Sequence, residues 1–183
     1  MKPALADNEC GPGYFVSDCP GRGKGVYTIR QYLTGAYVMA FAGTTVQYHA
    51  ISDFTHYIQI GPQEFLSPSG EADDFVNHSC DPNCALYLES GAMIMRTIRT
   101  IEKGDELTLD YGTILFSEPT SFTCECGSHN CRGQVGSYFL LPQHIRDYYR
   151  SRNMVPLLSL YSVNELQTAT FEKVISLAGH DSQ

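Results

Sequence analysis

The sequence has no apolar run approaching the roughly 20 residues that a membrane-spanning helix needs, and no apolar signal core follows its first residues. It is also poor in positive charge, because 12 Lys and Arg residues stand against 20 Asp and Glu residues and leave a net charge of -8. Such a surface repels nucleic-acid phosphates and attracts basic ligands. We therefore expect an intracellular protein, cytoplasmic or, in a eukaryote, nuclear, with a basic partner, no membrane contact and no direct nucleic-acid binding.

Regular alternation of strands and helices is missing as well, which argues against a doubly wound fold, and no internal repeat is present. Apolar residues make up 43% of the 183 residues, enough for one core of ordinary size. Short β-prone runs at close spacing predict an irregular β-rich domain. The expected strands are 26–29, 35–46 and 54–60, and a hairpin of 86–88 with 93–98 turned at Ser90 and Gly91.

The C-terminal part changes character and predicts helices. Pro142 is well placed as the first residue of a helix with Ile145, Tyr148 and Tyr149 on one side. A capping box at 162–165 then opens a second helix. These helices carry no chemistry of their own. They are expected to pack on the sheet or on a second copy of the chain, so a homodimer formed through them is one expectation.

The densest polar stretch is 77–83, which gathers an amide, an imidazole, a hydroxyl, a thiol and a carboxylate and is bent by Pro82. Such a cluster predicts a turn at which a buried segment reaches the surface. Polar groups at this density need partners. We expect Tyr111 and the run 124–131 to fold back onto this turn.

Two flanking segments each allow two interpretations. The glycine-rich run 21–25 is either a flexible turn or a loop whose backbone approaches a ligand closely. Glu71, Asp73 and Asp74 form either a solvated face or a docking rim for a basic substrate. The sequence alone leaves both pairs of alternatives open.

The cysteines are seven in number, and three of them, Cys124, Cys126 and Cys131, fall in one short run. A Cys-x-Cys pair is too close for an ordinary disulfide, whereas thiolates on a turn can converge on one tetrahedral zinc ion. A metal site in a reducing compartment explains this better than a secreted disulfide framework or a set of free buried cysteines. The candidates for a fourth ligand are Cys80, Cys84, Cys10 and His129.

Four motifs in this order resemble the SET-domain lysine methyltransferases with a zinc-binding post-SET segment. They are Gly-Lys-Gly at 23–25, Asn-His-Ser-Cys-Asp-Pro-Asn at 77–83, Gly-Asp-Glu-Leu-Thr-Leu-Asp-Tyr-Gly at 104–112 and Cys-x-Cys-Gly-x-x-x-Cys-Arg-Gly at 124–133. The resemblance implies a β-rich α+β fold of several small, mostly antiparallel sheets, with a pseudoknot, a zinc-binding post-SET loop and C-terminal helices. The implied parts are a flank (1–18), a SET domain (19–115), a post-SET zinc segment (116–136) and a helical extension (137–183), similar in size to a free-standing member.

The same resemblance implies methyl transfer from S-adenosylmethionine to a lysine side-chain amine in a basic protein, histone-like or other. The cofactor would lie in a pocket on one face, and the lysine would enter a narrow channel from the other. The implied residues are Tyr111 for catalysis; Lys24, Gly25, His56 or Tyr57, Asn77 and His78 for the cofactor; Phe41, Leu109 and Tyr111 for the channel; and Cys80, Cys124, Cys126 and Cys131 for zinc. Asp110 is expected to be a structural hydrogen-bond acceptor.

Three positions depart from the family pattern. Phe41 and its neighbours read Ala-Phe-Ala where an acidic residue and a tyrosine are common, Leu109 replaces a frequent aromatic, and Asp74 replaces an arginine. The number of methyl groups added and the substrate class stay open on this ground. Two other functions compete. One is a catalytically weak or inactive SET-fold module that binds basic tails, and the other is a zinc-dependent nucleic-acid binder, which the net charge of -8 disfavours.

Overall fold

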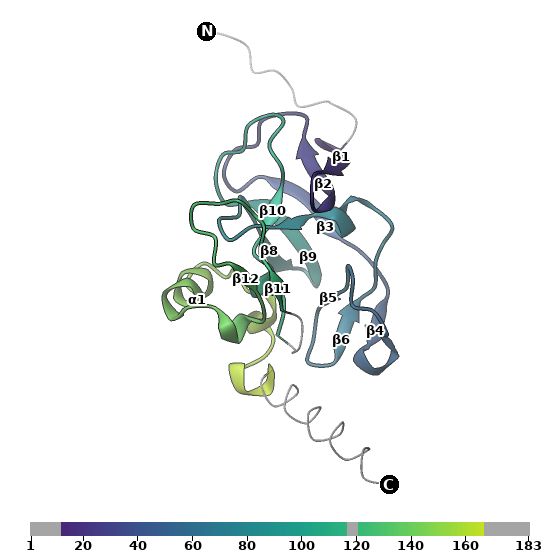
Figure 1. Ribbon diagram of the computed structural model, residues 1–183. Coiled ribbons are helices and arrows are strands. Elements are labelled where there is room, and N and C mark those ends of the chain that lie inside the picture. Colours follow the sequence, from purple (N-terminus) through teal and green to yellow (C-terminus); the bar gives the residue numbers. More distant parts are fainter. Residues whose placement is uncertain (1–11, 117–120, 167–183) are drawn as a thin grey trace.

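The computed structural model describes residues 12–116 and 121–166, and its strands form five small sheets (Figure 1). The strands are β1 Tyr14–Cys19, β2 Gly23–Thr28, β3 Tyr37–Phe41, β4 Thr45–Gln47, β5 Ile58–Gln59, β6 Glu64–Leu66, β7 Asn77–His78, β8 Cys84–Glu89, β9 Ala92–Thr97, β10 Thr108–Leu109, β11 Phe122–Thr123 and β12 Gln134–Val135. Among the described residues, every strand pair is antiparallel except β7 with β10. The predicted fold of several small, mostly antiparallel sheets is confirmed.

The sheet of β3, β9 and β8 lies at the centre of the hydrophobic core. Leu86 on β8 and Met95 on β9 are fully buried. β8 and β9 form the predicted hairpin, turned at Ser90 and Gly91, whose φ values are 49° and 82°. Positive φ at both central residues is the conformation that a two-residue type I′ turn requires. The hairpin prediction is therefore confirmed together with its turn.

The run 35–46, predicted as one strand, is divided between two sheets. β3 pairs with β9, whereas β4 pairs with β6. Gly43 lies between them with a φ of 152°, and the Ser67 carbonyl leaves no room for a side chain there. The glycine conformation at this position thus overrides the local β-propensity. The predicted strand 54–60 is also too long, because only Ile58–Gln59 pairs, as β5.

β7 and β10 are the parallel pair, and they bring two motifs together. Their register joins Asn77 to Thr108 and His78 to Leu109. Segments far apart in the sequence therefore lie side by side, as the expected pseudoknot requires. The chain continues from β10 directly into Tyr111, which places this residue beside the polar turn.

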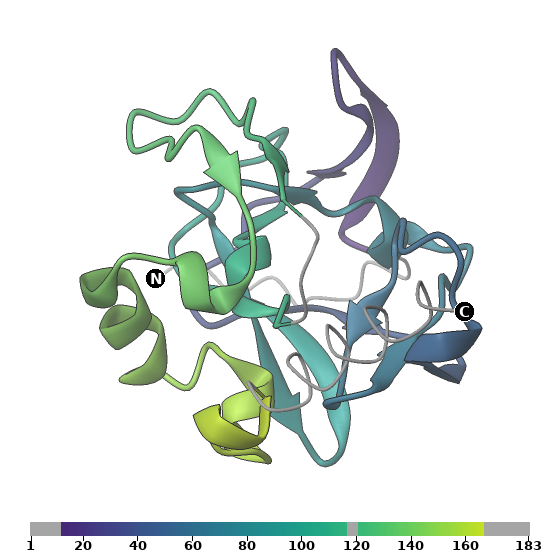
Figure 2. The same cartoon turned by 60° about the horizontal axis from the view of Figure 1, so that its bottom comes forward.

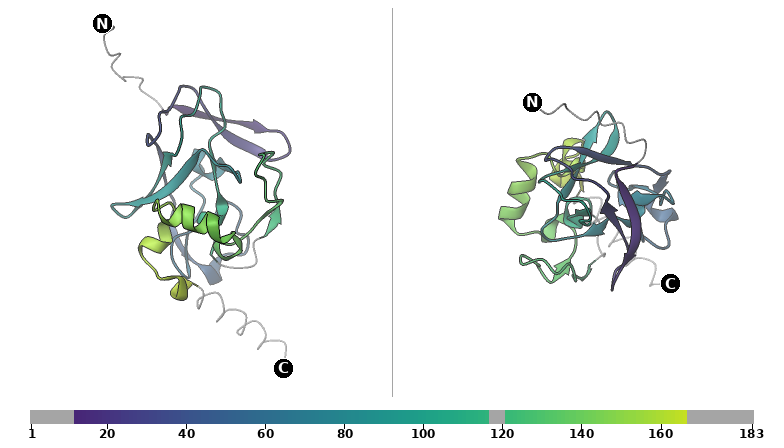
Figure 3. Two further views of the ribbon diagram at one scale, coloured as in Figure 1. Left: turned by 90° about the vertical axis from the view of Figure 1, so that its left-hand side faces the viewer. Right: turned by 90° about the horizontal axis from the view of Figure 1, so that it is seen from above.

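The helical elements are short. They are α1 Gln143–Arg150 and the 3₁₀ turns η1 Tyr48–Ala50, η2 Ala72–Phe75, η3 Tyr111–Thr113, η4 Tyr138–Leu140 and η5 Pro156–Ser159. Pro142 precedes α1 instead of being its first residue, and on the predicted inward face Tyr149 is buried whereas Tyr148 is 41% exposed. α1 lies on one side of the central sheet and β4, β5 and β6 on the other (Figures 1 and 2). The β1–β2 hairpin and η5 lie at opposite ends of the molecule (Figure 3).

The predicted capping box is present. The Ser162 N–H donates to Glu165 Oε2 at 2.7 Å, and the Glu165 N–H donates to Ser162 Oγ at 3.3 Å. The rest of the predicted second helix falls beyond residue 166 and outside the described residues. The homodimer expected through the C-terminal helices stays a prediction. Within the described ranges, no helix has the length and apolar character needed to cross a membrane.

Candidate active site and metal centre

Asn77 joins β2 to the segment before β10. Its side-chain amide donates to the Lys24 carbonyl oxygen and to Glu106 Oε1, both at 2.8 Å. Arg22 Nη2 lies 2.6 Å from Glu106 Oε2, so this carboxylate is bound from two sides. A Cβ on Gly25 would lie only 2.8 Å from Glu106 Oε1, which explains glycine there. Three of the expected cofactor residues, Lys24, Gly25 and Asn77, are thereby brought together.

His78 is buried, and two neighbours fix its ring. The Tyr111 backbone N–H donates to Nδ1 at 3.1 Å, and Nε2 lies 3.3 Å from the Cys80 sulfur. Burial lowers the pKa of His78 to about 4, although the nearby Asp110 carboxylate opposes this shift. A neutral imidazole that accepts at Nδ1 carries its proton at Nε2 and donates it to the sulfur. The ring of His78 thus connects the Tyr111 backbone with Cys80.

Tyr111 is held both at its side-chain hydroxyl and at its backbone. Its hydroxyl donates to the Val76 carbonyl oxygen at 2.7 Å. Its backbone opens η3, which is capped by Asp110 because the Asp110 carboxylate accepts the Gly112 N–H at 3.0 Å. Burial raises the pKa of Tyr111 to about 12. The hydroxyl is therefore a neutral donor at physiological pH.

A cavity of about 580 Å³, here called the Phe41 cavity, opens beside Tyr111. Phe41, Leu109 and Tyr111 all line it, and Phe41 and Leu109 are only 7% and 2% exposed. The three residues expected to form the channel are thus brought together. Because the deep wall is apolar, the cavity suits a long aliphatic side chain.

The acidic run contributes to the same cavity. Asp73 is buried, and its carboxylate accepts a backbone N–H at 2.9 Å and the Ser69 hydroxyl at 2.6 Å. Asp74 accepts the N–H groups of Ser69 and Gly70. Both acids line the Phe41 cavity with Asp53, and no Lys or Arg is among its described lining residues. Asp73 and Asp74 therefore do not belong to a freely solvated face, whereas Glu71 is exposed and does not line the cavity. The negative charge of the two aspartates favours a cationic ligand.

A second depression, here called the Asn77 hollow, adjoins the first. Its lining residues are Gly21, Arg22, Asn77, His78, Tyr111, Phe122, Thr123, Cys124, Glu125 and Cys126. Tyr111 and Phe122 line the Phe41 cavity as well, and their ring centroids are 6.3 Å apart. Tyr111 therefore lies at the boundary between an apolar cavity with acids and a polar hollow beside Asn77.

His56 and Tyr57 are not brought to the Asn77 hollow; they line the Phe41 cavity. His56 is exposed and has a φ of 64°, a conformation that few non-glycine residues adopt. Its ring centroid lies 5.7 Å from that of Phe75, and the Lys24 Nζ lies 5.0 Å from the same Phe75 centroid. The expected cofactor residues thus fall into two groups: Lys24, Gly25, Asn77 and His78 in one, and His56 and Tyr57 at the Phe41 cavity in the other. The Phe75 ring contacts Lys24 of the first group and His56 of the second.

The four cysteines expected to bind zinc are brought together. The sulfurs of Cys80, Cys124, Cys126 and Cys131 all lie within 4.8 Å of one another. Cys80 comes from the polar turn, and the other three come from the loop between β11 and β12. Four thiolates around one point are the donor set of a tetrahedral structural zinc site. This group is here called the cysteine cluster.

Backbone amides support the thiolate form in this cluster. The N–H groups of Cys80, Arg132 and Gly133 donate to the sulfurs of Cys126, Cys80 and Cys131 at 3.5, 3.4 and 3.4 Å. Burial would raise the pKa of Cys126, but hydrogen bonds from the Cys80 amide and from a serine hydroxyl outweigh it and lower the pKa to about 6. Burial raises the pKa of Cys80 and of Cys124 in the metal-free cluster, and a bound cation would offset this because coordination favours the thiolate. The four converging sulfurs therefore fit zinc by their geometry.

The other candidates for a fourth ligand lie elsewhere. Cys84 is 1% exposed within the main core, where burial raises its pKa to about 12. His129 is exposed and does not belong to the cysteine cluster. Cys10 falls outside the described residues. Cys80 is therefore the candidate that the geometry favours.

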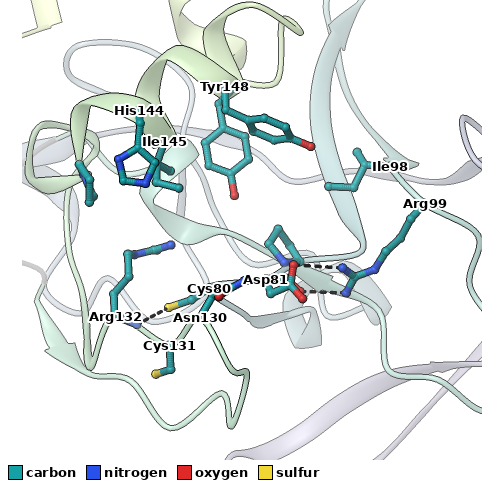
Figure 4. A pocket seen from close by; sticks show the side chains of 13 residues that line it. Cys80, Asp81, Ile98, Arg99, Asn130, Cys131, Arg132, His144, Ile145 and Tyr148 are labelled. Atoms are coloured by element: carbon teal, nitrogen blue, oxygen red, sulfur yellow. Dashed lines mark hydrogen bonds and ion pairs between the residues drawn. The ribbon is translucent and has the colours of Figure 1, made fainter.

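A third cavity, of about 670 Å³, separates α1 from the cysteine cluster and is here called the α1 cavity. Figure 4 shows Tyr148 of α1 facing Cys80 and Cys131 across it. Cys124 and Cys126 line the Asn77 hollow instead. The cysteine cluster is thus the wall between the Asn77 hollow and the α1 cavity.

Glu106, Phe122 and the Val76 carbonyl have no role predicted from the sequence. Glu106 stands within a motif, yet its pairing with Asn77 depends on the fold. Phe122 is an aromatic residue, 45% exposed, two positions before Cys124. An aromatic so close to a metal-ligand motif is a signal that could have found it. A backbone carbonyl leaves no such signal, because every residue has one.

The sequence of this chain is similar to those of known proteins. The family model described as SET domain matches residues 16–112. Drosophila melanogaster "Histone-lysine N-methyltransferase ash1" is 30% identical over 131 residues, 63% of this chain and 6% of that protein. Arabidopsis thaliana "Histone-lysine N-methyltransferase ASHH2" is 30% identical over 128 residues, which cover 68% of this chain and 7% of that protein. Gallus gallus "Histone-lysine N-methyltransferase SUV39H2" is 28% identical over 151 residues, which cover 63% of this chain and 37% of that protein. The chain thus spans at most 37% of the length of these three relatives.

Solved structures have a similar fold. The crystal structure of KRYPTONITE in complex with mCHH DNA, H3(1-15) peptide and SAH has a TM-score of 0.57 and 22% identity, and the match covers 66% of this chain and 29% of that chain. The complex of KRYPTONITE with mCHG DNA and SAH has a TM-score of 0.56 and 23% identity, with coverages of 65% and 28%. At this identity the likeness concerns the fold.

Proposed function

This chain belongs to the SET-domain family, whose model matches residues 16–112, and on this basis we propose that it is an S-adenosylmethionine-dependent protein-lysine methyltransferase. The observation that carries the proposal is the position of Tyr111, which lines both the Phe41 cavity and the Asn77 hollow. Relatives named histone-lysine N-methyltransferase, and a similar fold in complexes with SAH and an H3 peptide, support it.

The Asn77 hollow is the proposed place of S-adenosylmethionine. Asn77 and His78 line it, and Lys24 and Gly25 are proposed to contribute backbone groups from β2, which Asn77 contacts at the Lys24 carbonyl. The close approach of β2 to Asn77 is supported by Gly25, where a side chain would collide with Glu106. Backbone groups and a fixed amide are suited to the polar parts of a nucleoside and an amino acid. When bound, S-adenosylmethionine supplies a methyl group on a sulfonium centre.

The Phe41 cavity is the proposed place of the substrate lysine. A lysine amine has a pKa of about 10.4 in water, and only its neutral form is a nucleophile. Desolvation between Phe41 and Leu109, with the sulfonium charge nearby, favours the neutral amine. Tyr111 Oη and the Val76 carbonyl oxygen can each accept a hydrogen bond from that amine and orient its lone pair. Most of the acceleration then comes from positioning, which can contribute roughly 7 to 11 kcal/mol.

The substrate is proposed to be a basic, histone-like protein. Three carboxylates at the Phe41 cavity, from Asp53, Asp73 and Asp74, support this, as does the net charge of -8. The same charge disfavours direct binding of nucleic acid. His56 and Tyr57 are proposed to form the cavity rim. If the source is a eukaryote, a histone substrate makes the nucleus the expected location.

The cysteine cluster is proposed to hold one structural zinc ion. The metal would tie the loop between β11 and β12 to the polar turn, and through Cys80 and His78 to the Tyr111 backbone. The four-part division of the chain into flank, SET domain, zinc segment and helical extension is retained as part of this proposal.

The proposal is tested by incubating the full chain with methyl-labelled S-adenosylmethionine and the four core histones, followed by mass-spectrometric mapping of the modified lysines. Incorporation on lysine is the expected result. Binding of basic tails without any incorporation would overturn the proposal.

A non-catalytic module that binds basic tails is the second candidate. One observation favours it: Phe41 and Leu109 carry no hydroxyl, so among the described residues that line the cavity the hydroxyls come from Ser52, Thr55, Tyr57 and Tyr111 alone. Titration calorimetry with S-adenosylmethionine separates the two candidates, because only the methyltransferase needs to bind it. Absence of binding by the zinc-loaded chain would favour the module.

A further inference from the structure

We propose that Tyr149 of α1 is a positioning residue for Tyr111, so that the helical extension forms part of the catalytic unit; the inference rests on the proposed function of Tyr111. α1 lies outside residues 16–112, which match the SET-domain family. From its sequence, this helix was expected only to pack on the sheet or on a second copy of the chain. The structure instead joins it to the turn on which Tyr111 stands.

The link between α1 and Tyr111 runs through Asp110. The side chain of Asp110 is completely buried, and its Oδ2 accepts the Tyr149 hydroxyl at 3.0 Å. Its Oδ1 accepts Arg132 Nη2 at 2.7 Å and the Gly112 N–H at 3.0 Å. A buried carboxylate needs all of these donors, because an unsatisfied charge in the interior is costly. Tyr149 is therefore one of the groups that determine where the carboxylate stands.

The orientation of the Asp110 carboxylate matters to Tyr111 because it caps η3. The Gly112 N–H that it accepts belongs to the first turn of η3, and the Asp110 carbonyl accepts the Thr113 N–H at 2.9 Å. Tyr111 is the first residue of this turn. A rotation of the carboxylate would move the backbone from which the Tyr111 ring projects, and with it the hydroxyl near Val76.

A second contact holds the same turn. Leu141, just before α1, packs so closely on Gly112 that a Cβ there would lie 2.7 Å from its side chain. Elsewhere the α1 cavity separates the helix from the cysteine cluster, as the view across it shows (Figure 4). Burial and the Asp110 carboxylate raise the pKa of Tyr149 well above its usual value, so its hydroxyl keeps the proton that it donates.

The test compares Tyr149→Phe with Tyr148→Phe in the zinc-loaded full chain. The first variant removes only the hydroxyl that reaches Asp110. The second removes the hydroxyl of the neighbouring tyrosine, whose ring lies 4.1 Å from the Arg152 guanidinium carbon. Two properties are measured well below the melting temperature: hydrogen exchange of the Tyr111 and Gly112 amides by NMR, and kcat and KM for methyl transfer to a basic peptide.

We expect Tyr149→Phe to accelerate exchange at both amides about tenfold, the effect of losing one hydrogen bond to a charged group. kcat should fall about tenfold, and the KM values for the peptide and for S-adenosylmethionine should stay nearly unchanged. The reason is that misplacement of a catalytic group affects the chemical step. Tyr148→Phe should match the wild type in both measurements.

Unchanged exchange, or faster exchange with an unchanged kcat, would overturn the positioning role. A fall in activity that only follows the unfolded fraction would also overturn it, because a merely structural role predicts that result. Absence of methyl transfer in the wild-type chain would instead refute the proposed function, and the exchange data would then decide separately whether α1 holds the Tyr111 turn.

Discussion

The Tyr111 hydroxyl donates a 2.7 Å hydrogen bond to the Val76 carbonyl oxygen, and this bond fixes the phenol at the boundary of two cavities. Val76 itself is 3% exposed, so the carbonyl belongs to a residue of the hydrophobic core. The donor proton is used within the protein, and the Tyr111 oxygen keeps its acceptor capacity for a ligand. The pair thus offers two oxygens to an incoming amine.

Tyr111 should remain neutral across the pH range of ordinary enzymes, because its pKa is raised from 10.0 to about 12. A raised folded-state pKa gives full stability below the unfolded value. As pH rises from 10.0 to about 12, the unfolded chain ionises before the folded one, and the free energy of unfolding falls.

The measurement is urea unfolding of the wild type and Tyr111→Phe over this pH range. The wild type should lose about 2 to 3 kcal/mol more than the variant. Ionisation of Tyr111 near its ordinary pKa, seen as a phenolate absorbance missing from the variant, would contradict the assignment.

Cys80→Ser should release zinc and also weaken the binding of S-adenosylhomocysteine. The reason is that the Cys80 sulfur contacts His78 Nε2 at 3.3 Å, and His78 holds the Tyr111 backbone beside the Asn77 hollow. Loss of a group that supports a metal site typically costs about 10- to 100-fold in metal affinity or activity. We expect the affinity for S-adenosylhomocysteine to fall by a factor in this range. Native mass spectrometry gives the zinc content, and calorimetry gives the affinity.

Cys84→Ala is the matched control, since Cys84 is as buried but stands outside the cysteine cluster. It should keep one zinc ion. Should Cys80→Ser lose zinc yet bind S-adenosylhomocysteine normally, the polar turn would not be the common support of metal and cofactor.

The motifs predicted the residues of the site better than the β-prone runs predicted the strands. Cys124, Cys126 and Cys131 meet as expected, because their metal-ligand spacing is a local property of one loop. Cys80 lies 44 residues before Cys124, and only the family resemblance singled it out among the four candidates for the remaining ligand. The prediction of one strand over 35–46 was wrong, because the conformation of Gly43 outweighs the β-propensity of its neighbours.

Long-range polar contacts could not be predicted. The bond from Tyr149 to Asp110 and the amide bridge from Asn77 to Glu106 join segments whose relation only the fold decides. Asp110 was expected to be a structural acceptor, and the structure supplies its donors. His56 shows the same limit. The sequence could not decide between His56 and Tyr57 as a cofactor contact, and in the structure both residues line the Phe41 cavity.

Asp53→Asn should weaken the binding of a basic peptide substrate. Asp53 is fully exposed, and hydrogen bonds from the Thr55 hydroxyl and amide lower its pKa, so it is charged at neutral pH. Exposed charges act modestly and are screened by salt, so KM should rise about twofold at low ionic strength and by less at high ionic strength.

Asp18→Asn, an exposed acid on β1 outside the Phe41 cavity, serves as the control and should leave KM unchanged. Equal effects of the two variants would mean that net charge, and not the acids at this cavity, attracts the substrate.

The central claim is that Tyr111 aligns a lysine amine for methyl transfer, and a single-turnover rate measures this most directly. The zinc-loaded chain is mixed with S-adenosylmethionine and then with a saturating histone substrate, for the wild type and for Tyr111→Phe. The account predicts a fall of about 100- to 1000-fold in the rate of lysine methylation, with cofactor affinity unchanged. A rate in Tyr111→Phe equal to that of the wild type would contradict it.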